Sequence, residues 1–148
     1  MLKRFPRVGF KENRIILSIE ELKMRVKEAI QNNKSCEIGL YSFTTWYNGK
    51  PVPGTAIIDV VMLKGKKEIL EQIAEEYHKK KVRSTLVFDG KDYVLFLELF
   101  LGSIEELKKF TLPYKVKIVK DEMAKFILPG TLNLKTGKLC KIIKRWKS

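Results

Sequence analysis

The run TAIIDVVML, residues 55–63, constrains the fold more than any other stretch of the chain. It is nearly continuously apolar and rich in β-branched residues, which is typical of a strand buried on both faces. Such a strand predicts covering elements on each side of a sheet. Asp59 interrupts the run, and an ionised carboxylate there is costly unless a cation or hydrogen-bond donors accompany it.

Helical periodicity appears in three segments, residues 16–33, 66–81 and the stretch that begins at 102–110. In the first, Ser18 and Glu21 have the spacing of a capping box. Ile69, Ile73 and Tyr77 line one side of the second. The hexapeptide SIEELK occurs at 18–23 and again at 103–108; we interpret this as two independent capping boxes, with an internal duplication as the alternative.

Strand patterns account for much of the rest of the chain. They cover residues 35–43, 114–120, 125–128 and 138–143, and two more strands flank the hairpin signal Asp89-Gly90 within 83–101. Residues 44–54 are expected to form a loop. The sequence therefore predicts an α/β (α+β) fold, a single domain over 1–148 with a mixed β-sheet, two to three helices packed on it and a basic C-terminal segment at 135–148.

Charge is the strongest global signal. Thirty Lys and Arg oppose seventeen Asp and Glu, which gives a formal net charge of +13. Such an excess favours polyanionic partners through counterion release, although a charge-rich surface is also typical of hyperthermophile proteins. The N-terminal residues lack a signal-peptide pattern and no run is long enough for a membrane span, so we expect a cytoplasmic protein with no membrane partner.

Cys36 and Cys140 lie far apart without the spacing of a zinc site, and we expect a buried reduced pair, with a disulfide as the alternative. His78, the single histidine, is expected on the surface of the second helix.

Residues 128–137, LPGTLNLKTG, carry a resemblance to a known family. They are similar to the Leu-Pro-Gly-Ser-Leu-His-Gly-Lys-Thr-Gly motif of the catalytic small subunit of archaeal and eukaryotic primases. Colinear stretches resemble other parts of that family: the helix at 14–30, the strand at 40–47, the run at 54–62, the strand at 85–99 and the segment at 119–128. The resemblance implies a truncated member of the archaeo-eukaryotic primase superfamily that handles nucleic acid or nucleotides.

The departures from that family bear on catalysis. Asp59 matches the first aspartate of the family's metal-binding pair, but Val61 stands in place of the second. Val94 and Asn133 stand near or in place of family histidines, and the zinc-binding insertion is absent. Because cation binding depends on ligand count and charge, the resemblance implies a catalytically degenerate domain.

Three carboxylates, Asp59, Glu98 and Asp121, are the candidate catalytic residues, with Asp59 as the candidate metal ligand for Mg²⁺ or Mn²⁺ if the protein is catalytic. For each, an ordinary structural role stays open: an ion pair at a strand end for Asp59, a solvent-facing position for Glu98 and a turn for Asp121. Binding alone requires no cofactor.

The candidate residues for binding nucleic acid or phosphate gather near the C-terminus. Basic side chains with an interleaved aromatic ring suit a single strand, through phosphate contacts and base stacking. The set comprises Lys135, Thr136, Lys138, Lys141, Lys144, Arg145, Trp146 and, from an earlier loop, Trp46. An ordinary basic hairpin and a solvated tail are the alternatives.

The sequence thus favours a primase-like domain that binds single-stranded or template-primer nucleic acid, or nucleotides, as an accessory DNA replication factor alongside other replication proteins. One alternative is a small metal-dependent enzyme, either a minimal nucleotidyltransferase or a nuclease. Another is a basic module that docks an acidic protein. Whether the chain is an enzyme stays open at this point.

Overall fold

The computed structural model describes residues 2–10, 13–99, 104–119 and 121–147. Its α+β class confirms the prediction, but the single mixed sheet is corrected to two five-stranded sheets whose described pairings are all antiparallel. The first sheet contains β1 (Arg7–Gly9), β2 (Arg14–Ile16), β3 (Glu37–Phe43), β6 (Ala56–Ile57) and β11 (Lys125–Ile127). The second contains β7 (Val61–Gly65), β8 (Ser84–Phe88), β9 (Tyr93–Leu97), β10 (Lys117–Val119) and β14 (Lys141–Trp146).

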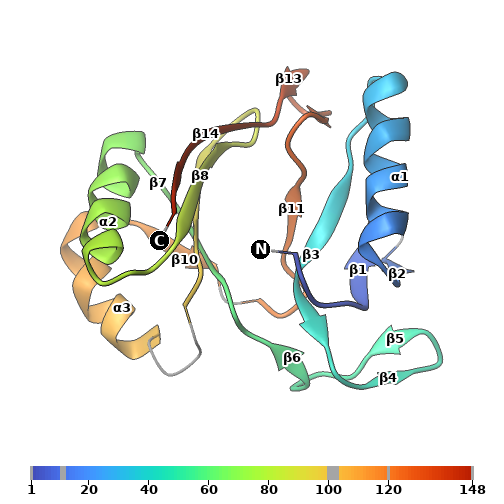
Figure 1. Cartoon of the computed structure of the whole chain (residues 1–148), viewed down its shortest axis with the longest axis horizontal. Helices are drawn as coiled ribbons and strands as arrows, with labels where there is room; N and C mark the ends of the chain where they lie inside the picture. Colours follow the sequence, from blue (N-terminus) through green and yellow to red (C-terminus); the bar gives the residue numbers. More distant parts are fainter. Residues whose placement is uncertain (1, 11–12, 100–103, 120, 148) are drawn as a thin grey trace.

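The two sheets face each other, and helices cover their outer faces (Figure 1). On the first sheet lies α1 (Ile19–Gln31), and on the second lie α2 (Lys67–Lys79) and α3 (Ile104–Thr111), which continues into a short 3₁₀ turn, Leu112–Tyr114. The molecule is therefore layered as helix, sheet, sheet and helices. This arrangement buries one face of each sheet against helices and the other against the opposite sheet.

The second sheet follows the element order β7-α2-β8-β9-α3-β10. β9 pairs antiparallel with both β7 and β8 and so separates these two parallel strands. This is the split β-α-β arrangement, in which a helical crossover joins two strands that are not neighbours. β14 adds a further strand at the edge, beside β8.

Local sequence explains how α1 begins. The backbone N–H of Glu21 donates to Ser18 Oγ at 3.2 Å, as the capping-box spacing predicts. The Glu21 carboxylate accepts from the backbone N–H of Leu17 rather than from that of Ser18. The second capping box begins at Ser103, which lies outside the described residues.

The sequence predicts one strand over residues 55–63, but the structure has two strands there, β6 and β7. β6 pairs with β3 in the first sheet, and β7 pairs with β9 and β10 in the second. Residues 55–59 are half-buried and residues 60–63 are buried, so the run enters the core only as it joins the second sheet. Asp59 lies at this crossing.

Two hairpins were not anticipated from sequence. β1 and β2 form one at the N-terminus, and the expected loop at 44–54 contains the other, made of β4 (Trp46–Tyr47) and β5 (Lys50–Pro51). The strand expected at 138–143 is divided between β13 (Lys138–Leu139), which pairs with β12 (Leu132–Asn133), and β14. Among the described residues, no helix is long and apolar enough to cross a membrane.

Candidate functional site

The segment between β11 and β14, residues 128–140, connects the two sheets at one end of the molecule (Figure 1). Leu128 N–H donates to the carbonyl of Cys36 at 2.9 Å, and Gly130 N–H donates to that of Cys140 at 2.8 Å. The buried Thr131 hydroxyl accepts from Cys36 N–H and donates to the Leu128 carbonyl. The Pro-Gly turn is thus a fixed bridge between sheets.

The turn between β12 and β13 binds the loop of the β8–β9 hairpin. Asn133 Nδ2 donates to the Asp89 carbonyl at 3.1 Å, and the Thr136 hydroxyl donates to the Gly90 carbonyl at 2.9 Å. Asn133 Oδ1 also accepts from the backbone N–H of Lys135. These bonds hold the Lys-Thr-Gly turn against the second sheet and fix the position of the Lys135 backbone.

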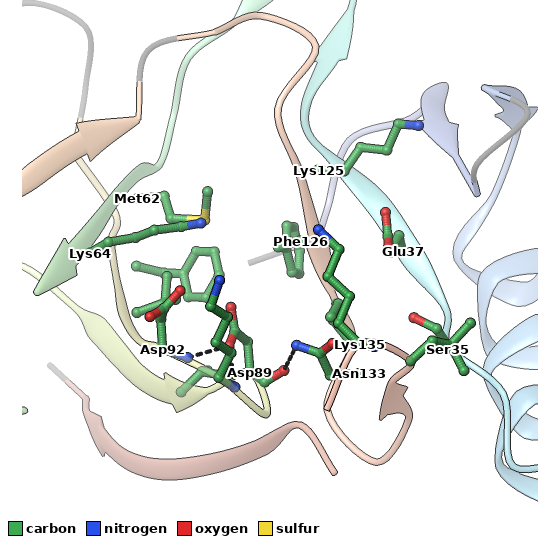
Figure 2. A pocket seen from close by; sticks show the side chains of 16 residues that line it. Ser35, Glu37, Met62, Lys64, Asp89, Asp92, Lys125, Phe126, Asn133 and Lys135 are labelled. Atoms are coloured by element: carbon green, nitrogen blue, oxygen red, sulfur yellow. Dashed lines mark hydrogen bonds between the residues drawn. The ribbon is translucent and has the colours of Figure 1, made fainter. Parts of the chain in front are cut away.

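A cavity of about 320 Å³ lies between the two sheets, beneath this turn. We call it the first cavity; its lining side chains are drawn in Figure 2. Its apolar wall includes Phe96 of β9 and Phe126 of β11, whose ring centroids are 4.9 Å apart. The full lining is Ser35, Glu37, Met62, Lys64, Val87, Asp89, Lys91, Asp92, Val94, Phe96, Lys125, Phe126, Ile127, Asn133, Leu134 and Lys135.

Four lysines, Lys64, Lys91, Lys125 and Lys135, border the first cavity from four different segments. Lys64 and Lys135 extend toward the space between the sheets, whereas Lys125 points away toward the end of β1 (Figure 2). Lys125 Nζ donates to the Phe10 carbonyl at 2.6 Å. In the described part of the chain, the ion pairs do not include Lys64, Lys91 or Lys135.

Three carboxylates, Glu37, Asp89 and Asp92, share the same cavity. Asp89 Oδ1 is occupied by the backbone N–H groups of Lys91 and Asp92, at 2.9 and 2.7 Å. The cavity therefore combines cations suited to phosphate with carboxylates suited to amino groups, above an apolar floor.

Asp59 lies among arginines. Its Oδ2 is 3.7 Å from Arg4 Nε, and its charge opposes the fall in the pKa of the buried Arg7, which burial lowers to about 10. Arg7 itself donates to the carbonyls of Arg4, Gly39 and Leu40. The geometry matches the structural alternative for Asp59, since nearby guanidinium groups disfavour a divalent cation at the same carboxylate.

The other two candidate carboxylates, Asp121 and Glu98, have different partners. Asp121 Oδ1 accepts from the backbone N–H of Met123 in a turn. Asp121 and Asp59 both raise the pKa of Tyr41, after the larger effect of burial, so both lie near this phenol. Glu98 follows β9 and lines a cavity that also borders Arg83 and Arg145. Within the described ranges, no three His, Cys, Asp or Glu side chains are grouped as a metal site would require.

The residues predicted to bind nucleic acid lie in different parts of the structure. Lys135 lines the first cavity, while Lys138 and Lys141 border another hollow, which Pro129 and Gly130 also line. Arg145 is exposed on β14. Lys144 Nζ lies 3.5 Å from Glu75 of α2, and the Thr136 hydroxyl is engaged with Gly90.

The two tryptophans lie apart (Figure 1) and form no shared stacking surface, and Lys144 Nζ lies over the Trp146 ring, 4.9 Å from its centroid. Trp146 is only 4% exposed and packs in the core beneath α2, where its indole N–H donates to Glu75 at 2.8 Å and lowers the pKa of that carboxyl. The sequence predicts an exposed ring, but the pairing of β14 with β8 directs the ring toward α2. Trp46 lies in the β4–β5 hairpin, at the opposite end of the molecule from β13 (Figure 1).

Cys36 and Cys140 are free and buried, as predicted for a reduced pair. Burial raises the pKa of the Cys140 thiol to about 12 and that of Cys36 to about 11. His78 is half-buried on α2, and its Nε2 lies 2.7 Å from the Lys147 carbonyl.

The sequence alone did not identify five residues of this site: Lys64, Lys91, Lys125, Glu37 and Asp92. A signal existed for Lys64: it lies two residues after Met62, on the same face of β7, and so brings a charge onto a face otherwise read as buried. The remaining residues converge only through tertiary structure.

No protein-family model, curated protein or solved structure matches this chain.

Proposed function

We propose that this protein binds single-stranded nucleic acid or nucleotides in the first cavity, as a primase-like domain without a working catalytic metal centre. The observation that carries the proposal is the position of Lys64, Lys91 and Lys135 around one inter-sheet cavity, free of ion pairs among the described residues. Phosphate oxygens are the natural partners of such ammonium groups.

The mixed lining favours a nucleotide over a simple anion. Glu37 and Asp92 offer acceptors for the amino groups of a base, which a bare phosphate site does not need. A cavity of about 320 Å³ is within the size range of small-molecule sites. The net charge of +13 adds long-range attraction for a polyanion.

The resemblance to primases supports the same function, since Lys135 of the Lys-Thr-Gly turn lines the cavity. An accessory role in DNA replication follows from that resemblance. Magnesium-dependent catalysis has less support, because Arg4 and Arg7 already accompany Asp59.

The test compares two pairs of lysines with equal changes in charge. The variant Lys64→Gln with Lys135→Gln removes two cavity cations, and the control Lys23→Gln with Lys109→Gln removes two exposed cations from α1 and α3. Fluorescence anisotropy with a labelled single-stranded oligothymidylate measures affinity at several salt concentrations. We expect at least a roughly tenfold loss for the cavity pair and a salt slope lower by about 1.4.

The control pair is expected to lose less than about threefold, because it removes only long-range attraction. Equal losses for both pairs would place the affinity in overall charge rather than in the cavity and would contradict the proposal. Absence of binding by the unaltered protein at low salt would also reject it. Salt-sensitive capture of an acidic protein would then favour the interaction-module alternative.

A further inference from the structure

A second cavity, of about 450 Å³, adjoins the first. Ser35, Glu37 and Leu134 line both, so the two hollows share one wall. The other residues of the second cavity are Phe10, Arg14, Arg25 and Lys34. Three of its seven lining residues are cationic and one is acidic, which makes it more basic than the first cavity.

Phe10 and Arg25 give this second cavity a flat, positively charged surface. The Arg25 guanidinium lies over the Phe10 ring, 5.6 Å from its centroid. Such a pair presents planar groups on which a base stacks, and arginine adds a charge for phosphate. Phe10 is held from two sides, since its N–H donates to the Glu37 carbonyl and its carbonyl accepts from Lys125 of the first cavity.

Two polar atoms at this place are buried without a hydrogen-bond partner in the described structure, Arg25 Nε and Ser35 Oγ. Ser35 lines both cavities and Arg25 lines the second. A buried donor without a partner costs free energy. Because both side chains line the cavity, a rotation of either would bring its donor to a bound acceptor. Phosphate or base oxygens are such acceptors.

Resting on the function proposed above, we propose that the second cavity is a subsite for a neighbouring nucleotide of the same strand. The ligand class is then a single-stranded oligonucleotide that spans both cavities, rather than a free mononucleotide. One nucleotide lies between the sheets near Lys64 and Lys135. The next passes Ser35 and reaches Arg14, Arg25 and Lys34.

The experiment measures two probes, thymidine triphosphate and a labelled eight-nucleotide oligothymidylate, on the full chain. The variant Arg14→Gln with Lys34→Gln changes two exposed side chains of the second cavity. We expect at least a fivefold loss of affinity for the oligonucleotide and less than a twofold change for the triphosphate. The Lys64→Gln/Lys135→Gln variant should weaken both probes.

An unchanged oligonucleotide affinity in Arg14→Gln/Lys34→Gln would overturn the subsite and leave the proposed function intact. Equal losses for both probes would do the same, since they would indicate a general charge effect. If the unaltered protein binds neither probe, the proposed function fails and the subsite fails with it. Arg25→Gln, checked for folding by circular dichroism, should reproduce the selective loss.

Discussion

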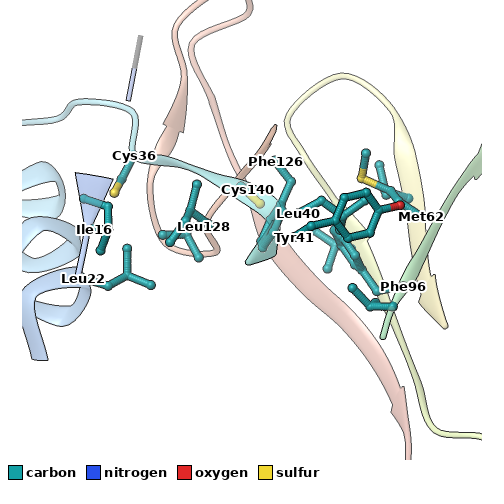
Figure 3. Close-up of a cluster of buried hydrophobic side chains, with 14 of the residues drawn as sticks. Ile16, Leu22, Cys36, Leu40, Tyr41, Met62, Phe96, Phe126, Leu128 and Cys140 are labelled. Atoms are coloured by element: carbon teal, nitrogen blue, oxygen red, sulfur yellow. The ribbon is translucent and has the colours of Figure 1, made fainter. Parts of the chain in front are cut away.

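The two faces of the second sheet differ in what they pack against and in what they leave open. The outer face, under α2 and α3, contributes Leu63, Leu95 and Leu97 to a core in which each of these side chains is fully buried. The inner face, which meets the first sheet, contributes Met62 and Phe96 to the other core (Figure 3) and also carries Lys64 beside the first cavity.

One sheet therefore serves two purposes. Successive residues of a strand point to opposite faces, so Leu63 and Lys64 are neighbours in sequence with opposite surroundings. Helices close the outer face with apolar side chains. The inner faces of the two sheets pack less closely, and a cavity lies between them. The connecting segment 128–140 holds the sheets together at one end.

Leu95→Ala on the outer face should destabilise the protein most. This side chain is fully buried, and its removal should lower the free energy of unfolding by about 4 kcal/mol, near the upper part of the usual range for such changes. The matched inner variant is Met62→Ala. Because Met62 lines the first cavity, this truncation should lower the free energy of unfolding by only about 2 kcal/mol. Urea unfolding followed by circular dichroism measures both.

Leu112→Ala is the control for these two variants, because Leu112 is 82% exposed and should change stability very little. A cost for Met62→Ala equal to or above that for Leu95→Ala would contradict the distinction between a closed outer layer and an open inner one.

A smaller effect is expected where the Lys-Thr-Gly turn meets the β8–β9 loop. Gly90 has φ +93°, and an added Cβ would lie 2.6 Å from Asn133 Cβ and 2.9 Å from the Lys138 carbonyl oxygen. Gly90→Ala should therefore destabilise the fold by about 3 kcal/mol through backbone strain and displacement of the turn. Denaturant midpoints and oligonucleotide affinity should fall together, because the turn carries Lys135.

Gly137→Ala provides the matched control in the same turn. Gly137 has φ +71° but nothing lies within 4 Å of its added Cβ, so only backbone strain, about 1 kcal/mol, is expected. Similar costs for both glycines would show that the contact between turn and loop contributes little.

The sequence predicted the elements with strong local signals. Ser18 and Glu21 placed the start of α1, the apolar spacing placed α2, and Asp89-Gly90 placed the β8–β9 hairpin. It did not predict that residues 55–63 divide between two sheets, because two short strands joined by a short link have nearly the same apolar composition as one long strand. It also gave no signal for the short strands β1 and β2.

The candidate site was predicted less well for a physical reason. Lys135 was identified because it follows a recognisable turn, but the other lysines come from β7, the β8–β9 loop and β11 and meet only in the folded molecule. The Trp146 prediction was wrong because the basic segment is strand β14, whose pairing with β8 directs the Trp146 ring toward α2. Asp59 was singled out by burial cost, which arginine partners satisfy as well as a metal would.

The smallest predicted effect is a change of stability with pH, caused by titration of the Cys140 thiol in the inner core. The unfolded thiol of Cys140 loses its proton near its ordinary pKa of 9.0, whereas the folded thiol keeps it until about pH 12, because burial, and then Asp89, raise its pKa. Its stabilising contribution is therefore complete below pH 9 and lost as pH rises from 9 toward 12. Between pH 8 and 10, the unaltered protein should lose about 1 kcal/mol more than Cys140→Ala does.

Urea unfolding at the two pH values measures this difference, and each protein serves as its own reference, so the packing cost of the substitution cancels. Cys36, in the same inner core, has a pKa raised to about 11 and should behave alike. Buried tyrosines on both faces, Tyr41 and Tyr77, also have raised pKa values, but they titrate in both proteins and leave the comparison unchanged. Identical pH dependence with and without Cys140 would mean that water reaches the thiol, and that the inner layer is more open than its packing indicates.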